Sequence, residues 1–286
     1  MNIKSDCLVC LLNQSLRVSK HLKLNEDQSQ ELLRQASEAI ATYADVPPPV
    51  AASDLYPRLS NLLKREDLYA KLKAKSTQEA FKLLPIVRDA IEQESSRISI
   101  AIKAAVAGNV IDFATPNQFD LVEEFDKIFQ SDFALDEEED FLAKLSRAKE
   151  FMIIGDNVGE HLFDKLLLEE IAKLYPDLKL YYAVRGVPII NDVTLKEAQE
   201  IGMEEVAKVV DSGVNTPGLV YEVASSDFMA LYQRMDLILA KGMGNYECLE
   251  GVGDLRIYHL FKVKCEVVAT TVGARLGSLV FKNNLT

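Results

Sequence analysis

Apolar residues recur every three or four positions through the first third of the chain. The segments EDQSQELLRQASEAIATYA (26–44) and LYAKLKAKSTQEAFKLLPIVRDAIEQ (68–93) both follow this spacing, which is typical of amphipathic helices. The prolines of DVPPPVAASDLYPRL (45–59) end one helix and begin another. A mostly apolar segment, SRISIAIKAAVAGNVIDF (96–113), predicts a further, buried helix that closes at Gly108–Asn109. We therefore expect an all-helical N-terminal region over residues 1–115.

The pattern changes in the second half of the chain. After the acidic helical segment DEEEDFLAKLSRAK (136–149), short apolar runs alternate with helical segments. The runs are EFMIIG (150–155), LKLYYAV (178–184), AKVVD (207–211), MDLILA (235–240) and KCEVVAT (264–270). This alternation is typical of a parallel sheet covered by helices on both faces. We predict an α/β fold, in which a three-layer α/β/α domain with a mostly parallel sheet spans residues 116–286.

Polar residues and glycines follow several of the predicted strands. They are Asp156–Asn157, Asn191–Asp192, Ser212–Gly213 and the run Lys241–Gly242–Met243–Gly244–Asn245. In open parallel sheets, ligands bind at the carboxyl ends of the strands. The strand ends therefore predict a binding site along one edge of the sheet.

The residue types at these strand ends suit a metal ion and a phosphate. Asp156, Asn157 and Asp192 are hard oxygen donors, which favour Mg²⁺, Mn²⁺ or a related divalent ion. Lys241 and the backbone N–H groups of the glycine turn after it can hold phosphate oxygens.

Each of these residues also has a purely structural interpretation. Asp156 or Asn157 can cap a helix that begins near Gly159, and Asp192 can cap the helical segment after it. Lys241 can be a solvated lysine, with the glycines forming a tight turn. Only their coincidence at successive strand ends favours a metal-phosphate site.

The chain is strongly acidic, with 32 Lys+Arg against 44 Asp+Glu and a net charge of −12. Such a surface repels nucleic acid and anionic lipid, so we expect neither as a partner; an anionic ligand would need local positive charge. No apolar run reaches membrane-spanning length, and the first residues lack signal-peptide organisation. These features predict a soluble cytoplasmic protein, and they leave its oligomeric state open.

Two of the four cysteines form a C-x-x-C, Cys7 and Cys10. This spacing suits a redox pair or half of a metal site. Cys265, at a predicted strand start, could meet them in space and complete a redox switch or a second metal site. Buried cysteines acting as small hydrophobes would show the same sequence.

Seven short motifs, taken in order, resemble the domain-of-unknown-function-89 family of metal-dependent damage-control phosphatases, in its archaeal and bacterial branch. They are DCLVC (6–10), AGNVIDF (107–113), GDNVGEHLFDK (155–165), RGVPIINDVT (185–194), DSGVNTPG (211–218), LAKGMGNYE (239–247) and VKCEVVA (263–269). The resemblance covers essentially the whole chain. That family shares its fold with a eukaryotic protein named as an acidic residue methyltransferase.

The resemblance implies that Asp156, Asn157 and Asp192 ligate a divalent Mg, Mn, Co or Ni ion. It also implies that Lys241 contacts the phosphoryl group of the substrate. The activity it implies is phosphatase action on small phosphorylated metabolites, such as sugar phosphates or damaged side products.

Further residues are weaker candidates for the site. Glu160 is a possible base or outer-shell ligand, or a first-turn glutamate favoured by the helix dipole. Asn109 can approach from the helical region or cap its helix, and Arg185 can bind a substrate anion or pair with an acid. Backbone N–H groups around Asn245, and those of Ser212 and Gly213, are candidates for holding phosphoryl oxygens.

Two other functions stay open. One is a carboxyl O-methyltransferase, although GDNVGE (155–160) is not a glycine-rich methyl-donor loop. The other is a non-enzymatic protein that binds a metal or phosphate ligand. The chain lacks a G-x-x-x-x-G-K-[ST] loop, which argues against an ATP-driven kinase. The D-x-D-x-T pattern of haloacid dehalogenases is also missing, but both a water and an attacking carboxylate stay open as the nucleophile.

Overall fold

The computed structural model describes residues 1–110 and 127–284, with the side chains of residues 109 and 110 left aside. Its N-terminal part is helical, as predicted. The helices are α1 (Ser5–His21), α2 (Glu26–Ile40), α3 (Pro48–Leu63), α4 (Ala70–Gln93) and α5 (Arg97–Val110). Within the described ranges, no helix is both long and apolar enough to cross a membrane.

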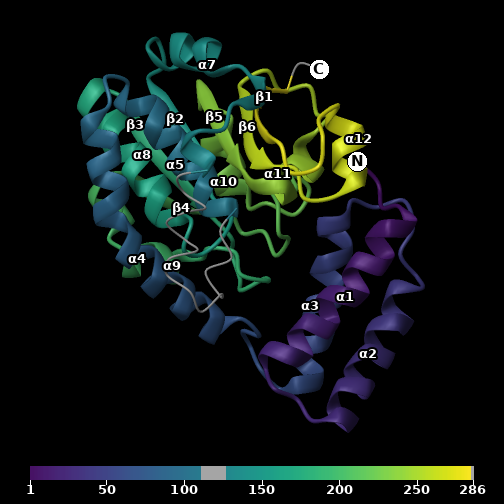
Figure 1. Ribbon diagram of the computed structural model, residues 1–286. Coiled ribbons are helices and arrows are strands. Elements are labelled where there is room, and N and C mark those ends of the chain that lie inside the picture. The colour runs from purple at the N-terminus through teal and green to yellow at the C-terminus, as the bar shows by residue number, and fades with distance from the viewer. Residues whose placement is uncertain (111–126, 285–286) are drawn as a thin grey trace.

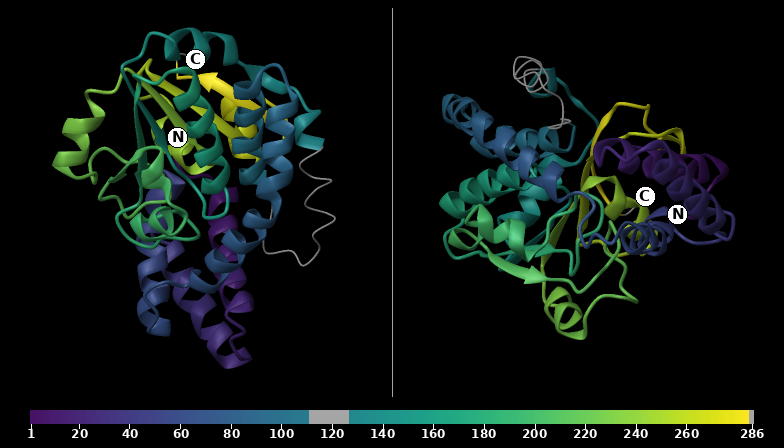
Figure 2. Two further views of the ribbon diagram at one scale, coloured as in Figure 1. Left: turned by 90° about the vertical axis from the view of Figure 1, so that its left-hand side faces the viewer. Right: turned by 90° about the horizontal axis from the view of Figure 1, so that it is seen from below.

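Helices α1, α2 and α3 share a hydrophobic core of their own, centred on buried residues such as Val18, Leu32 and Leu55. The local sequence explains where these helices begin. Asn25 and Gln28 form a capping box that starts α2, and prolines occupy the first turn of α3, where a missing N–H costs nothing. In Figures 1 and 2, this three-helix cluster projects beyond one end of the α/β layers.

The remaining described residues form a seven-stranded sheet with the order β1-β7-β6-β5-β2-β3-β4. All neighbouring strands run parallel except β6 and β7, which are antiparallel. The strands are β1 (Phe133–Asp136), β2 (Glu150–Ile154), β3 (Lys179–Val184), β4 (Lys208–Asp211), β5 (Leu237–Lys241), β6 (Ile257–Lys262) and β7 (Leu279–Asn283). The predicted mostly parallel α/β fold is confirmed.

Successive residues of each central strand point to opposite faces of the sheet, and each face has its own helical layer. The first layer contains α4, α5, α7 (Glu138–Leu145) and α8 (His161–Leu174), which pack against residues such as Phe151 and Ile153 of β2. The second contains α10 (Ser226–Tyr232) and α11 (Gly242–Leu249), which pack near Met152 and Ile154. The result is three layers, α/β/α (Figure 1).

The predicted division at residues 115 and 116 lies outside the described residues. The five N-terminal helices do not pack as one unit. Helices α4 and α5 contribute residues such as Leu83 and Ile102 to the core on one face of the sheet. The separate helical core is built mainly by α1, α2 and α3, with Leu68, Tyr69 and Ile189 added from the segments around it. We propose that the chain is organised around these two cores.

One predicted strand is wrong. The run KCEVVAT (264–270) lies mostly in helix α12 (Glu266–Val272), and Cys265 is its N-cap, with Sγ accepting a 3.5 Å hydrogen bond from the Val268 N–H. A short apolar run does not distinguish a strand from a buried helix by periodicity alone. The strands β1, β6 and β7 were not among the predicted ones.

Candidate active site

The loop after β3 folds back across the end of β2. Two backbone hydrogen bonds, of 2.9 and 2.8 Å, join residues 156–158 to residues 191–193. They place Asn157 in an antiparallel β-bridge with Asp192. Next to this bridge, the Asn157 amide donates a 2.7 Å hydrogen bond to Asp156 Oδ2. Backbone pairing therefore brings together the three predicted metal ligands.

Asp156, Asn157 and Asp192 line one cavity of about 370 Å³. The other walls come from α1, through residues such as Arg17, from α3, and from Lys264, Cys265 and Val267 at the start of α12. The cavity therefore lies between the carboxyl edge of the sheet and the helices α1 and α3.

Helix capping does not explain these three residues. The N-cap of α8 is Glu160. The N-cap of α9 (Leu195–Glu200) is Thr194, whose capping box with Glu197 includes a 3.0 Å hydrogen bond from the Thr194 N–H to Glu197 Oε2. Asp156, Asn157 and Asp192 thus lie upstream of both caps, and the structural interpretation offered by the sequence is wrong for them.

Burial and mutual repulsion make the two carboxylates costly to ionise. Burial, followed by the charges of Glu160 and Asp192, raises the pKa of Asp156 well above its usual range. Burial also raises the pKa of Asp192, although Arg185 opposes this effect. A bound cation would relieve this penalty, because it favours the charged forms of both acids.

The junction of β5 and α11 lies directly against Asp156. Gly242 has φ = +78°, and a Cβ atom on it would fall 1.8 Å from Asp156 Oδ2. Only a residue without a side chain fits here. The glycine turn predicted from the sequence is therefore part of the wall around a candidate ligand.

Gly242→Ala is expected to lower the rate of any reaction catalysed at this site at least about tenfold, because the new methyl group must displace the Asp156 carboxylate and a 1 Å misplacement can cost up to about 100-fold. Gly251→Ala is the matched control, since Gly251 has φ = +79° and a Cβ atom added to it would meet no other atom within 4 Å. Both variants carry the same backbone strain, so equal losses in steady-state rate would contradict the proposed contact.

Arg185 and Asn245 hold the strand ends together. Arg185 is buried and donates from Nε to Asp192 Oδ2 (2.8 Å) and from Nη2 to Asn245 Oδ1 (3.3 Å). The Asn245 amide in turn donates to the Lys241 carbonyl (2.7 Å) and the Gly155 carbonyl (3.2 Å). Of the two interpretations of Arg185, the structure shows the pairing with an acid.

Lys241 is fully buried beneath the site. Its ammonium group donates to Glu160 Oε1 (2.7 Å), to Asp164 Oδ1 (2.5 Å) and to the Ala105 carbonyl (3.0 Å). Burial opposes its charge, but Asp164 and Glu160 outweigh burial and raise the pKa of Lys241. All three N–H bonds are used, and Lys241 is not among the described residues that line the cavity. The predicted contact with a phosphoryl group would require these ion pairs to break.

The other predicted site residues are distributed unevenly. Gly244 lines the cavity. The Ser212 hydroxyl donates to the Val184 carbonyl (2.6 Å), the Gly213 N–H donates to Asp211 Oδ1 (2.7 Å), and neither residue is among the described residues that line the cavity. The side chain of Asn109, in the last turn of α5, lies outside the described residues.

Two cations on the cavity wall were missed by the sequence analysis. Arg17 comes from α1 and Lys264 precedes α12, and both side chains are exposed. Lys264 lies close enough to lower the pKa of Asp156, against the larger effect of burial. The motif VKCEVVA contains this lysine, but no strand-end argument pointed to it, because the segment was taken for a strand.

The donor set fits a divalent ion. Among residues 1–110 and 127–284, no group of three or more His, Cys, Asp or Glu side chains is placed to hold a metal. The predicted set instead combines two buried carboxylates with the amide of Asn157. Such a set suits Mg²⁺, because this ion binds through one or two carboxylates and keeps several waters.

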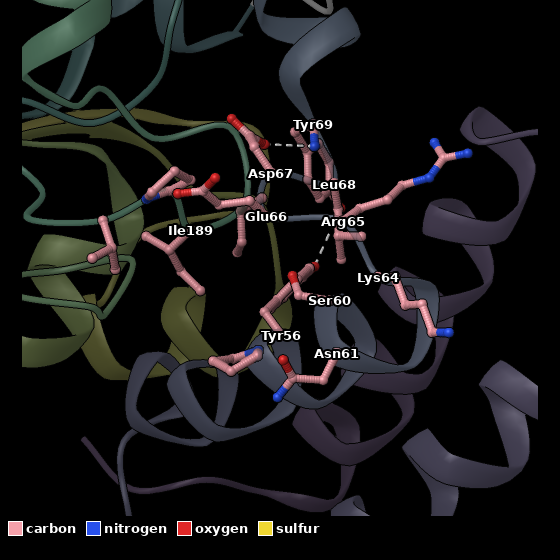
Figure 3. Close-up of a pocket in the computed structure, with 14 residues that line it drawn as sticks. Tyr56, Ser60, Asn61, Lys64, Arg65, Glu66, Asp67, Leu68, Tyr69 and Ile189 are labelled. Atoms are coloured by element: carbon pink, nitrogen blue, oxygen red, sulfur yellow. Dashed lines mark hydrogen bonds between the residues drawn. The ribbon is translucent and has the colours of Figure 1, made fainter.

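A second pocket, of about 560 Å³, lies on the other side of the loop 187–190. Figure 3 shows it between α3, with Tyr56 and Ser60, and Ile189; the Arg65 side chain points away from Ile189. None of the predicted metal ligands is among the described residues that line it. We therefore place the chemistry in the smaller cavity.

The chain matches the damage-control phosphatase ARMT1-like domain over residues 3–280. It belongs to this family. The predicted resemblance is confirmed.

Individual relatives agree with the family assignment. A damage-control phosphatase of Pyrococcus horikoshii is 31% identical over 287 residues, covering 99% of both chains. A damage-control phosphatase of Archaeoglobus fulgidus is 29% identical over 289 residues, again covering 99% of both. The crystal structure of the Pyrococcus horikoshii protein, titled as a DUF89 family protein, matches this structure with a TM-score of 0.93. The names of these relatives support a phosphatase role for this family member.

Proposed function

We propose that this chain is a divalent-metal-dependent phosphatase that hydrolyses phosphomonoesters of small metabolites. The observation that carries the proposal is the convergence of Asp156, Asn157 and Asp192 on one cavity wall. Sugar phosphates and damaged phosphometabolites are the substrate classes we expect, and the cavity of about 370 Å³ suits a molecule of that size.

Asp156, Asn157 and Asp192 would hold the metal. When bound, the ion would polarise a phosphoryl oxygen and make a bound water more acidic. Arg185 keeps one oxygen of Asp192 fixed through its 2.8 Å hydrogen bond. Asp192 is thereby oriented before any substrate arrives, which lowers the reorganisation needed for catalysis.

The substrate phosphate would meet local positive charge on the cavity wall. Lys264 and Arg17 lie on the cavity wall and are exposed to it, so both can contact phosphate oxygens. The backbone N–H groups near Gly244, in the first turn of α11, add neutral donors at a helix N-terminus.

Glu160 and Lys241 act as positioning residues in this proposal. The Asn157 amide lies 3.5 Å from Glu160 Oε2, and Glu160 is itself held by the 2.7 Å bond from Lys241. Asn157 is thus linked to Lys241 through Glu160. Lys241 helps to position the candidate metal ligand Asn157 and does not contact the phosphate.

Metal removal tests this proposal. Chelation with EDTA is expected to abolish phosphate release from p-nitrophenyl phosphate or a sugar phosphate, and adding back Mg²⁺, Mn²⁺, Co²⁺ or Ni²⁺ one at a time should restore it. Phosphate release that survives complete metal removal would contradict the metal-dependent mechanism. A protein that binds the ions by calorimetry yet turns over no member of a broad phosphometabolite panel would instead be the non-enzymatic binder.

A further inference from the structure

Three cysteines line the same cavity as the candidate metal ligands. Cys7 and Cys10 come from α1, and Cys265 caps α12 on the adjoining wall. All are free thiols. The proposed hydrolysis uses none of them, so their place at the cavity needs a separate explanation.

A soft-metal site does not fit these thiols. In the parts of the chain that the structure describes, no three Cys, His, Asp or Glu side chains are arranged to hold a metal ion. The alternative left open by the sequence, a redox pair, depends instead on two thiols that can approach each other.

Cys7 and Cys10 meet that condition. They are three residues apart in α1, so their Cβ atoms are about 5–6 Å from each other, whereas a disulfide needs about 4 Å. The difference falls in the first turn of the helix, where Lys4 offers no side-chain cap and the Cys7 N–H bonds to the Lys4 carbonyl at 2.9 Å. A local change of this turn toward the tighter 3₁₀ winding can supply the required shift of about 1–2 Å, because that winding places the side chains of residues i and i+3 over each other.

We propose that Cys7 and Cys10 form a reversible disulfide, made by exchange with a low-molecular-weight disulfide, and that this bond controls the cavity. The thiolate of Cys10 attacks one sulfur of the reagent, whose S–S bond breaks and releases one thiolate that takes up a proton. Cys7 then loses its proton and attacks the sulfur of Cys10, releasing the second thiol. Two electrons pass from the protein to the reagent.

The exposure of each thiol indicates which one attacks the reagent and which one closes the disulfide. Cys10 is exposed and open to a reagent, with the Gln14 amide donating to its Sγ at 3.4 Å. Cys7 is 8% exposed, so it reacts only with a partner already inside the protein. Burial also raises the pKa of Cys7, which suits a resolving thiol better than an attacking one.

The expected effect of the Cys7–Cys10 disulfide on activity rests on the proposed phosphatase function. Closing the bond pulls the first turn of α1 by about 1–2 Å, and this turn forms a wall of the cavity opposite Asp156 and Asp192. We expect the oxidised protein to lose about tenfold in kcat/KM, within the range that small displacements near reacting groups produce.

The test is a titration of the full chain with mixtures of glutathione and glutathione disulfide. Free thiols are then alkylated, and the masses of the intact protein and its peptides are measured, with the rate of phosphate release in parallel. The expected product is lighter by two hydrogen atoms, carries a Cys7–Cys10 link, and returns to the dithiol on reduction. Cys7→Ser should instead accumulate glutathione on Cys10, while Cys10→Ser should resist both changes.

Cys248→Ser is the matched control, because burial raises the pKa of Cys248 and removing this thiol should change nothing in the titration. A link through Cys265, or no link at all, overturns the assignment of the pair. A Cys7–Cys10 disulfide with unchanged kcat/KM overturns the proposal that this bond controls activity at the cavity. Inactivity of the reduced protein would count against the phosphatase proposal, and the mass measurement would still decide the thiol chemistry.

Discussion

Asp156→Asn is expected to lower kcat/KM for phosphomonoesters about 100- to 1,000-fold, because a catalytic metal contributes several kcal/mol and each 1.4 kcal/mol is tenfold in rate. The side chain keeps its shape but loses the charge that would hold the ion. The same change should leave the melting temperature of the metal-free protein at least as high as before. The pKa of Asp156 is raised by burial, so its ionised form destabilises the fold at neutral pH.

The measurement combines steady-state phosphate release with metal titration by calorimetry. Asp177→Asn is the control, since Asp177 is exposed in the loop before β3. Unchanged metal affinity in Asp156→Asn would refute the assignment of this ligand. A fall in melting temperature would show that the substitution acts through the fold.

Lys241→Met is expected to destabilise the protein by about 3–5 kcal/mol, the usual cost of removing one partner from a buried ion pair. Both carboxylates beside Lys241, those of Glu160 and Asp164, are fully buried. Losing the ammonium group removes the cation that neutralises both buried carboxylates. The deficit should shrink between pH 8 and pH 5, because carboxylates left in an apolar site then take up protons.

Equilibrium unfolding in urea measures this effect. Lys179→Met provides the comparison, because Lys179 also pairs with a glutamate, Glu150, at 3.1 Å but its side chain is 67% exposed. An exposed pair contributes less than about 1 kcal/mol. Similar losses for the two lysines would show that Lys241 does not hold the buried carboxylates as described.

The sequence predicted the parts of this protein that depend on local pattern. Apolar runs followed by polar residues located β2, β3 and β5, and the rule that parallel strands share a carboxyl edge then brought Asp156 and Asp192 together. The backbone pairing between residues 156–158 and 191–193 was not predicted, yet it is what fixes their distance. Strand-end logic finds such a site because the sheet itself aligns the strand ends.

Other features depend on long-range packing and could not be read from one segment. Lys241 is the last residue of β5, one position earlier than predicted, and its direction is set by Asp164 and by the carbonyl of Ala105, 136 residues away in the chain. Lys264 was not predicted as a site residue, because the apolar spacing of the run after it does not distinguish a helix from a strand. Their roles follow from partners that only the folded chain brings near.

The candidate cavity has walls that belong to two separate hydrophobic cores. The wall with the candidate metal ligands lies at the edge of the sheet, while Leu11 and Ala52 of the facing wall belong to the core of α1, α2 and α3. Substitutions inside that helical core can shift the facing wall without disturbing the sheet. Substrate choice in such an enzyme can therefore diverge among relatives while the reaction chemistry is inherited unchanged.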